Sequence, residues 1–248
     1  MERDVVALGG PEGRHAATVR RLRPGERADL IDGDGMLAEC VVAAARPGRL
    51  ELTVLGRHRV PPPQPRICVV QAIPKGDRGE QAVEMMTEVG VDVIVPWAAE
   101  RCVPVWGPAG GPDSPPGAGT PAGPAGRSPR ALDRWRSAAR EAAKQSRRAR
   151  IPEVTAPAGT ADLLARVGAA ATAIVLEPGA GAGLGSLPLP AAGEIILIVG
   201  PEGGVSPAES AAFAAAGAAA ARLGPTVLRA STAGTAAAAV LLSRCGRW

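Results

Sequence analysis

Three segments rich in glycine and proline each follow a short hydrophobic run. They are LEPG at 176–179, VGPEGG at 199–204 and LGPTVLR at 223–229. Glycine permits positive φ and close approach of a ligand, and proline stiffens the chain, so backbone N–H and C=O groups would surround a flat apolar pocket. Such groups suit an adenine and a ribose. The candidate binding residues are Leu176, Glu177, Pro178, Val199, Gly200, Pro201, Glu202, Gly203, Leu223, Gly224, Val227 and Leu228.

Any one of these segments alone is best read as a tight turn, but three at one sheet edge favour a binding site. Glu202 has two interpretations: it accepts hydrogen bonds or faces a cation, or it stabilises the start of a helix at 206. A phosphate-binding G-x-x-x-x-G-K-[ST] motif is absent, and PKGDRGE stands where a dinucleotide fold would carry G-x-G-x-x-G. These absences disfavour a nucleotide-dependent oxidoreductase or NTPase.

Strands and helices must alternate to bring the three segments together. Apolar runs predict strands at 66–73, 91–97, 171–178, 194–199 and 219–225, and helices are predicted at 77–90, 131–148, 206–216 and 232–244. Ser206, Pro207 and Glu209 form a capping signature, Asp77 and Glu80 have the same spacing, and Gly90 and Gly217 end their helices. The pattern predicts an α/β domain with a mainly parallel sheet, where ligands bind at the carboxyl ends of strands.

The N-terminal part of the chain has a different pattern of apolar runs. Short apolar runs at 27–31, 36–45 and 49–56 are separated by turns, which predicts a small β-barrel over residues 1–62. PPPQP at 61–65 indicates a stiff linker, and residues 66–248 form the α/β domain. Residues 107–130 are a Gly/Pro-rich segment that we expect to be a flexible surface loop without a function of its own.

Composition limits the classes of function. The net charge of +4 comes almost wholly from arginine, which suits phosphate and base recognition, although genome composition accounts for much of the Arg, Ala, Gly and Pro content. One Phe and no Tyr disfavour a base-stacking platform. Four scattered cysteines and two histidines predict no metal site. The N-terminus MERDVVALGG has no apolar leader and no run is long enough to span a membrane, so we expect a cytoplasmic protein.

Several motifs together resemble one family. LIVGPEGGVSPAE with LGPTVLRASTAGTAAAAV resembles the C-terminal signature of the RsmE family of ribosomal RNA methyltransferases, in the SPOUT superfamily. RHAATVRRLRPGE with LIDGDG resembles the PUA-like RNA-binding barrel of that family. PKGDRGEQAVEMMTEVGV, AERC and RWRSAAREAAKQSRRARIPEV resemble its first α/β segment, the following loop and its central basic helix. The resemblance runs almost from end to end.

The resemblance implies S-adenosylmethionine as the methyl donor and N3 of a uridine in 16S rRNA of the small ribosomal subunit, position 1498, as the acceptor. It also implies a homodimer and a C-terminal trefoil knot. Two departures matter. The segment at 107–130 is longer than the resemblance needs, and the family often has Thr-Glu-Thr after the final Leu-Arg, whereas this chain has Ala230, Ser231 and Thr232. A catalytic carboxylate at that place is therefore not supported.

Methylation of N3 requires loss of its proton, which leaves negative charge on the uracil oxygens that an arginine could stabilise. Arg229 is the first candidate, with a structural salt bridge as the alternative. Ser231 or Thr232 could hydrogen-bond the base or cap the last helix. No side chain is an evident general base, so solvent or a backbone carbonyl could take the proton.

Basic clusters predict where RNA binds. Phosphate contacts from two clusters would clamp folded RNA, although a charged run is often only a solvated face. The candidates are His15, Arg20, Arg21, Arg23, Lys75, Arg78, Arg101, Arg147 and Arg148, with Lys144 and Arg150 in the same run as the last two. Two alternatives stay open: a different SPOUT reaction, such as ribose 2′-O or guanosine N1 methylation, and a non-catalytic rRNA-binding assembly factor.

Overall fold

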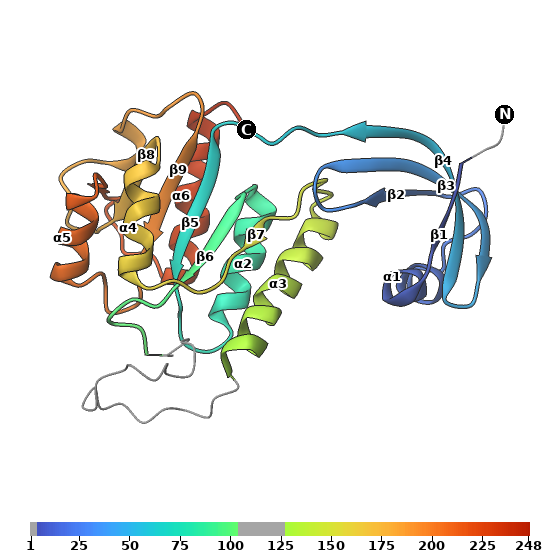
Figure 1. Cartoon of the computed structure of the whole chain (residues 1–248), viewed down its shortest axis with the longest axis horizontal. Coiled ribbons are helices and arrows are strands. Elements are labelled where there is room, and N and C mark those ends of the chain that lie inside the picture. Colours follow the sequence, from blue (N-terminus) through green and yellow to red (C-terminus); the bar gives the residue numbers. More distant parts are fainter. Residues whose placement is uncertain (1–3, 104–126) are drawn as a thin grey trace. The chain divides into compact units, whose positions relative to one another are not determined.

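The computed structural model describes residues 4–103 and 127–248. The chain forms two compact units (Figure 1). The first comprises Met1–Pro62 together with Arg148–Arg150, and the second comprises Pro63–Arg147 and Ile151–Trp248. The return of three residues to the first unit was not predicted from the sequence.

The first unit is built on a four-stranded antiparallel sheet in the order β1-β4-β3-β2. Its elements are β1 (Val5–Leu8), α1 (Gly10–Arg14), a π-helical turn (His15–Val19), β2 (Arg27–Ile31), β3 (Met36–Arg46) and β4 (Arg49–Arg59). Ala16 from the helical turn packs with Cys40, Val42, Leu50 and Leu52 in a small core. The three predicted strands are confirmed as β2, β3 and β4, whereas β1 and the helical turns were missed.

The turn between β2 and β3 is held by one side chain. Asp32 Oδ1 accepts hydrogen bonds from the N–H of Asp34 at 2.7 Å and of Met36 at 2.9 Å. The N–H of Asp34 is the main reason that the pKa of Asp32 lies below its usual value. The turn thereby joins β2 to β3, which pair in an antiparallel register.

The second unit is a six-stranded parallel sheet in the order β10-β8-β9-β5-β6-β7. The strands are β5 (Arg66–Ala72), β6 (Val93–Trp97), β7 (Glu153–Val154), β8 (Thr172–Leu176), β9 (Glu194–Val199) and β10 (Ala219–Ala221). The predicted α/β class with a parallel sheet is confirmed. The two-residue β7 is too short to be read from an alternating pattern.

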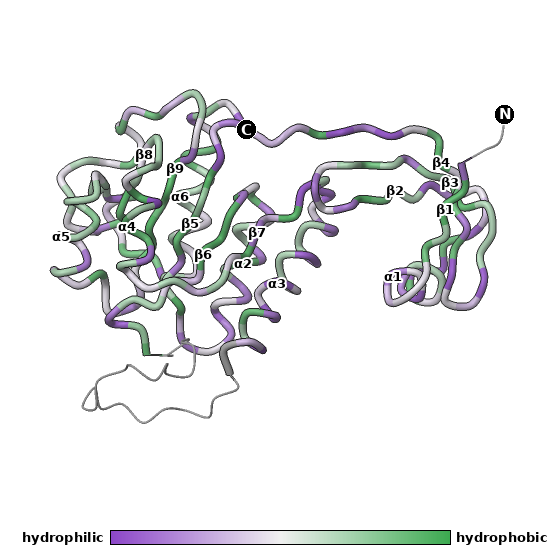
Figure 2. Tube along the Cα trace, in the orientation of Figure 1, coloured by the Kyte–Doolittle hydropathy of each residue, from purple (hydrophilic) through white to green (hydrophobic). Residues whose placement is uncertain are grey.

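Helices cover both faces of this sheet. They are α2 (Arg78–Val89), α3 (Arg127–Gln145), α4 (Thr160–Ala169), α5 (Pro207–Ala215) and α6 (Ala230–Arg244), with a 3₁₀ turn at Leu184–Ser186. Alternate residues of β5 point to opposite faces: Val69 packs with residues of α2, α3 and α6, and Val70 packs with residues of α4 and α5. Hydrophobic and hydrophilic residues alternate along α3 in Figure 2, as expected for a helix with one face on the sheet and one in solvent.

Two predicted helix boundaries need correction. We predicted that α3 would start at 131 after a loop at 107–130, but it starts at Arg127, and residues 104–126 lie outside the described part of the chain. Asp77 and Glu80 do not form a capping box, since Asp77 makes no side-chain capping bond and Glu80 pairs with Arg134 of α3. An ion pair between two packed helices replaces the local cap.

The capping box of α5 is confirmed and reaches further than predicted. Ser206 Oγ accepts from the N–H of Glu209 at 3.2 Å, and Glu209 Oε2 accepts from the N–H of Ser206 at 3.1 Å. The buried Glu209 also accepts from the N–H of Glu100 at 2.8 Å and from Thr160 Oγ1 at 3.0 Å. Trp97 Nε1 donates to the same Thr160 hydroxyl at 3.1 Å. One carboxylate therefore joins α4, α5 and the loop after β6.

Replacing Glu209 by Ala removes the acceptor for these buried donors. We expect Glu209→Ala to lower the free energy of unfolding of the second unit by roughly 3 kcal/mol, because buried unpaired donors are costly. Urea unfolding followed by tryptophan fluorescence measures this, since Trp97, Trp135 and Trp248 all lie in the second unit. Glu88→Ala, at an exposed position of α2, is the control and should leave the midpoint unchanged. Equal midpoints for both variants would contradict the role of Glu209.

Candidate active site

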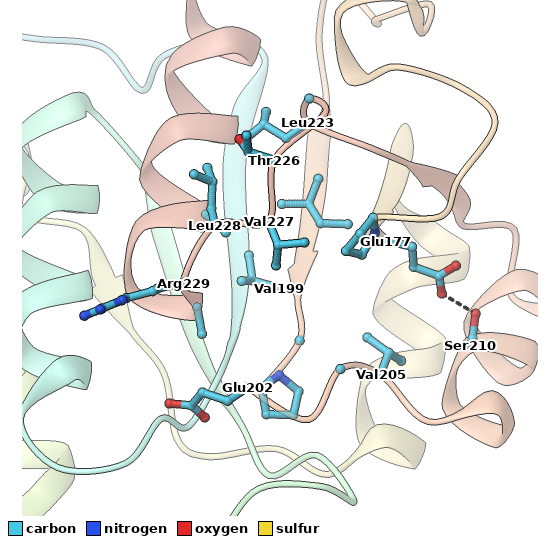
Figure 3. A pocket seen from close by; sticks show the side chains of 18 of the residues that line it. Glu177, Val199, Glu202, Val205, Ser210, Leu223, Thr226, Val227, Leu228 and Arg229 are labelled. Carbon is cyan, nitrogen blue, oxygen red and sulfur yellow. Dashed lines mark hydrogen bonds between the residues drawn. The ribbon is translucent and has the colours of Figure 1, made fainter.

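A cavity of about 690 Å³ lies at the carboxyl ends of β8 and β9. Figure 3 shows side chains from the three glycine- and proline-rich segments around it. The lining residues are Leu176, Glu177, Pro178, Val199, Gly200, Pro201, Glu202, Gly204, Val205, Pro207, Ser210, Leu223, Gly224, Thr226, Val227, Leu228, Arg229, Ala230 and Ala233. The three segments therefore form one site rather than three unrelated turns.

The sheet order explains why the segments meet. Strands β8 and β9 are parallel neighbours, so the loops that follow them leave the same edge of the sheet. The third segment follows β10, which pairs with β8 on its other side. Arg222 then fastens this segment to the loop after β8: its Nη1 donates to the carbonyls of Ala180 at 2.8 Å and Gly181 at 2.6 Å. The N–H of Leu184 donates back to the Arg222 carbonyl at 2.8 Å.

Two glycines in the loop after β9 are required by the local geometry. A Cβ on Gly200 would lie 2.9 Å from Val205 Cγ2 and 3.2 Å from the Val205 N atom, so the loop could not keep its fold. Gly204 has a φ of +72°, which side chains rarely adopt. The loop folds back tightly on itself and exposes its backbone to the cavity.

The cavity lining includes two carboxylates and one guanidinium. Glu177 Oε1 accepts a hydrogen bond from Ser210 Oγ at 2.5 Å. Glu202 Oε1 lies 3.6 Å from Arg78 Nη1. Arg229 supplies the backbone N-cap of α6, and within the described ranges its exposed side chain has no ion pair or hydrogen bond. Figure 3 shows Glu202 and Arg229 turned to one side of the cavity, and Glu177 with Ser210 on the other.

The cavity wall includes every predicted cofactor-binding residue except Gly203. Of the two catalytic candidates, it includes Arg229 but not Ser231. Gly203 is not a lining residue, because it packs against Arg101, whose Nη1 donates to the Gly203 carbonyl at 2.9 Å. Ser231, predicted as catalytic, is 6% exposed in the first turn of α6 and is not a lining residue either. The structural salt bridge considered for Arg229 is not found in the described part of the chain.

The sequence analysis missed seven lining residues. They are Gly204, Val205, Pro207, Ser210, Thr226, Ala230 and Ala233. Ser210 lies one turn inside α5, and Ala233 one turn inside α6. Helical periodicity counted from each loop could have found these two, because residues three or four positions apart share a helix face.

The predicted RNA-binding residues fall into both units. His15, Arg20, Arg21 and Arg23 are exposed in the first unit. Lys75, Arg78, Arg101 and Arg147 are exposed in the second unit. Arg148 belongs to the first unit together with Arg150, which pairs with Asp34 at 2.9 Å. Arg150 therefore has a structural role.

The four cysteines are buried or half-buried. All four are free, and burial is the main cause that raises the pKa of each thiol, that of Cys68 to about 12. Among the described residues, no group of three or more His, Cys, Asp or Glu side chains could hold a metal ion. In the same part of the chain, every helix is too short or too polar to cross a membrane.

A cavity framed by glycine-rich loops at the carboxyl ends of parallel strands is typical of ligand-binding α/β proteins. Family models are more specific: residues 61–110 and 124–242 match an RNA methyltransferase domain, and residues 8–55 match an RNA methyltransferase PUA domain. The chain belongs to the RsmE family of ribosomal RNA small subunit methyltransferases, since it matches this domain over most of its length and is 45% identical to a member of the family. The resemblance found in the sequence is thereby confirmed.

Individual relatives support the same assignment. A ribosomal RNA small subunit methyltransferase E of Mycobacterium bovis is 45% identical over 248 residues, covering 98% of this chain and 88% of the relative. The same enzyme of Neisseria gonorrhoeae, solved bound to S-adenosyl methionine, has a TM-score of 0.80 at 27% identity, covering 98% of this chain and 92% of that one. A Legionella pneumophila protein described as a methyltransferase, solved with bound SAM, has a TM-score of 0.80 at 25% identity, covering 98% and 93%.

The Arg222 side chain should determine how often the cavity opens. We expect Arg222→Ala to speed amide hydrogen exchange at Leu184 and at 223–229 about tenfold, because the hydrogen bonds to the 180–181 carbonyls are lost. Hydrogen exchange read by mass spectrometry measures this. Arg140→Ala, which removes an exposed arginine of α3, is the matched control. Unchanged exchange in the Arg222 variant would show that the backbone bonds alone hold the segment.

Proposed function

We propose that this chain transfers a methyl group from S-adenosylmethionine to N3 of a uridine in 16S rRNA of the small ribosomal subunit, at position 1498 by family resemblance. The single observation that carries the proposal is the cavity formed by three loops at one sheet edge. Family membership and the two relatives solved with the cofactor support it. A substrate of this kind also implies a cytoplasmic protein.

The residues of the cavity fit the cofactor. Leu176, Val199, Leu223, Val227 and Leu228 offer an apolar surface for an adenine, and the loop backbones supply groups that can read its edges. The 690 Å³ cavity lies within the usual range for a cofactor of this size. Glu177 and Glu202 place negative charge around a ligand that carries a sulfonium and an ammonium group.

The bound cofactor would supply an electrophilic methyl group, so the protein chiefly has to align the base and stabilise charge. Alignment at near-attack distance contributes roughly 7–11 kcal/mol to such reactions. Loss of the N3 proton would leave an anion on the uracil oxygens, and the guanidinium of Arg229 at the cavity wall, which has no ion pair among the described residues, would bind it. We expect solvent to take the proton, because the two carboxylates of the lining are engaged by Ser210 and Arg78.

Recognition of RNA would use cations of both units. The exposed His15, Arg20, Arg21 and Arg23 belong to the PUA-like unit, which we propose closes as a barrel around its small core. Arg78 and Arg101 lie at the loop that also lines the cavity. Phosphates would contact the outer cations and hold the register, while the target base enters the cavity.

We further propose that the C-terminal segment forms a trefoil knot. After β10, at the sheet edge, the chain returns to the centre, where α6 packs with residues of β5 and β9. The segment 180–186 lies across this return path and is bonded to Arg222 and to Arg244. A C-terminal helix that passes beneath an earlier loop is the threading that a knot requires, and an experimental chain trace would test it.

The family resemblance also implies a homodimer. We expect light scattering coupled to size exclusion to give twice the mass of the 25.0 kDa chain. Elution at the mass of one chain at micromolar concentration would contradict the dimer, and it would leave the proposed reaction to be tested by itself.

Arg229 provides the test of the chemistry. We expect Arg229→Ala to lower kcat for methylation of unmethylated small subunits about a hundredfold, because one donor to the developing anion is lost. Affinity of Arg229→Ala for S-adenosylmethionine, measured by calorimetry, should stay within about twofold of the wild-type value. The kcat of Arg229→Lys should lie between those of wild type and Arg229→Ala, since lysine keeps the charge without the planar fork.

Nucleoside mass spectrometry of the treated rRNA identifies the product. The proposal predicts 3-methyluridine. Detection of a 2′-O-methylated ribose or of N1-methylguanosine instead would show that the protein catalyses another SPOUT reaction. Absence of cofactor binding by the folded protein would leave a non-catalytic rRNA-binding factor.

Gly200 tests the cavity itself. We expect Gly200→Ala to weaken cofactor binding at least about tenfold, because a Cβ at 2.9 Å from Val205 must displace the loop. Gly185→Ala is the control: it lies outside the cavity and a Cβ there meets nothing within 4 Å. Equal cofactor affinities in calorimetry for the two variants would place the cofactor elsewhere.

A further inference from the structure

The loop at 200–204 has two functional faces. One face lines the cavity through Gly200, Pro201, Glu202 and Gly204. Two exposed arginines, both candidates for RNA binding, are attached to the same loop. Arg101 donates to the Gly203 carbonyl at 2.9 Å, and Arg78 lies 3.6 Å from Glu202. The loop is therefore in contact with the cavity and with two candidate phosphate ligands at once.

Glu202 is less firmly held than the other carboxylate of the cavity. Glu177 has a hydrogen bond of 2.5 Å to Ser210, whereas the 3.6 Å separation from Arg78 is too long for a hydrogen bond. The side chains of Arg78 and Glu202 are 46% and 35% exposed, so water weakens their attraction. The alternative role of Glu202 at the start of α5 is already filled by Ser206 and Glu209. Glu202 is thus free to exchange partners.

The arginines attached to this loop suit a phosphate. A guanidinium binds phosphate oxygens through a planar fork of donors. Arg101 is fixed because Gly203 has no side chain: a Cβ there would lie 3.3 Å from Arg101 Cβ. Arg78, at the first residue of α2, is held only by Glu202 among the described contacts. A phosphate therefore competes with Glu202 for Arg78.

We propose that Glu202 is a positioning residue that couples the charge of the cofactor to the binding of RNA. A cation in the cavity attracts the Glu202 carboxylate away from Arg78, and Arg78 then joins Arg101 in binding a phosphate beside the target uridine. The inference rests on the proposed function. By linkage, RNA that engages Arg78 strengthens binding of the charged cofactor by the same factor.

The reaction itself changes the charge that Glu202 meets. Methyl transfer breaks the S–CH₃ bond and forms an N3–CH₃ bond, with the sulfur retaining the electron pair and the N3 proton passing to solvent. The sulfonium becomes the neutral thioether of S-adenosylhomocysteine. Glu202 then returns to Arg78, and the grip on RNA weakens after the methyl group has been transferred. The coupling would favour release of the modified RNA.

Non-reacting ligands that differ in charge test the coupling. Sinefungin carries an ammonium group where the donor carries its sulfonium, and S-adenosylhomocysteine is neutral there. We expect wild-type protein saturated with sinefungin to bind unmethylated small ribosomal subunits about fivefold more tightly than protein saturated with S-adenosylhomocysteine. Filter binding at constant ionic strength measures both affinities, because phosphate contacts depend strongly on salt.

Two variants should remove the difference in opposite ways. Glu202→Gln frees Arg78 permanently, so both complexes should bind subunits as tightly as the wild-type sinefungin complex. Arg78→Ala loses the phosphate contact, so both should bind as weakly as the wild-type S-adenosylhomocysteine complex. Glu84→Gln makes the same charge change at an exposed position of α2 and should keep the wild-type ratio.

The sign of the Glu202 result separates coupling from a structural role. Weaker subunit binding by Glu202→Gln than by wild-type protein, with either ligand bound, would overturn the proposal and leave Glu202 as a loop support. An equal loss of affinity for sinefungin and for S-adenosylhomocysteine in this variant would do the same. A wild-type ratio near one, in protein that forms 3-methyluridine, would reject the coupling alone. Failure of wild-type protein to bind either ligand would reject the proposed function first.

Discussion

The site depends on the path of the chain after β10. That strand lies at the edge of the sheet, while α6 buries Ala237, Ala238, Leu241 and Leu242 in the core over the central strands. Burial of a leucine side chain stabilises a fold by about 1.5–3 kcal/mol, so the core holds α6 firmly in place. Residues 222–229 must then cross the sheet edge to reach α6, and they close the cavity against the loops after β8 and β9. The cavity is a consequence of core packing.

In this arrangement, the groups that would bind the cofactor differ from those that would take part in the chemistry. Backbone and apolar side chains form most of the wall, which suits a nucleoside. The charged groups are few, and each has a distinct environment: Glu177 is hydrogen-bonded, Glu202 is loosely paired, and Arg229 is unpaired within the described residues. A reaction whose electrophile arrives with the cofactor needs little more than such positioning and one cation.

Local signals in the sequence predicted the parts of the structure that are decided locally. Hydrophobic runs ending in glycine and proline located the strands and the three loops, and Ser206 with Glu209 marked a helix start that the structure confirms. Such features depend on a few adjacent residues. The family resemblance then supplied the cofactor and the class of reaction, neither of which follows from periodicity.

Long-range pairs account for what the sequence could not predict. Glu80 pairs with Arg134 of another helix instead of capping its own, and Arg148–Arg150 belong to the N-terminal unit. The pattern shows where a loop turns but not which of its residues line the cavity, and Gly203 packs against Arg101 instead. Ser231 is a catalytic candidate in the sequence, yet the first turn of α6 buries it.

The most direct test of the site is a crystal structure of the protein soaked with S-adenosylmethionine. The account predicts density for the adenosyl group within the cavity, in contact with backbone atoms of all three segments, 176–178, 199–204 and 223–228. Density at another surface, or contacts from only one of the three segments at full occupancy, would contradict it.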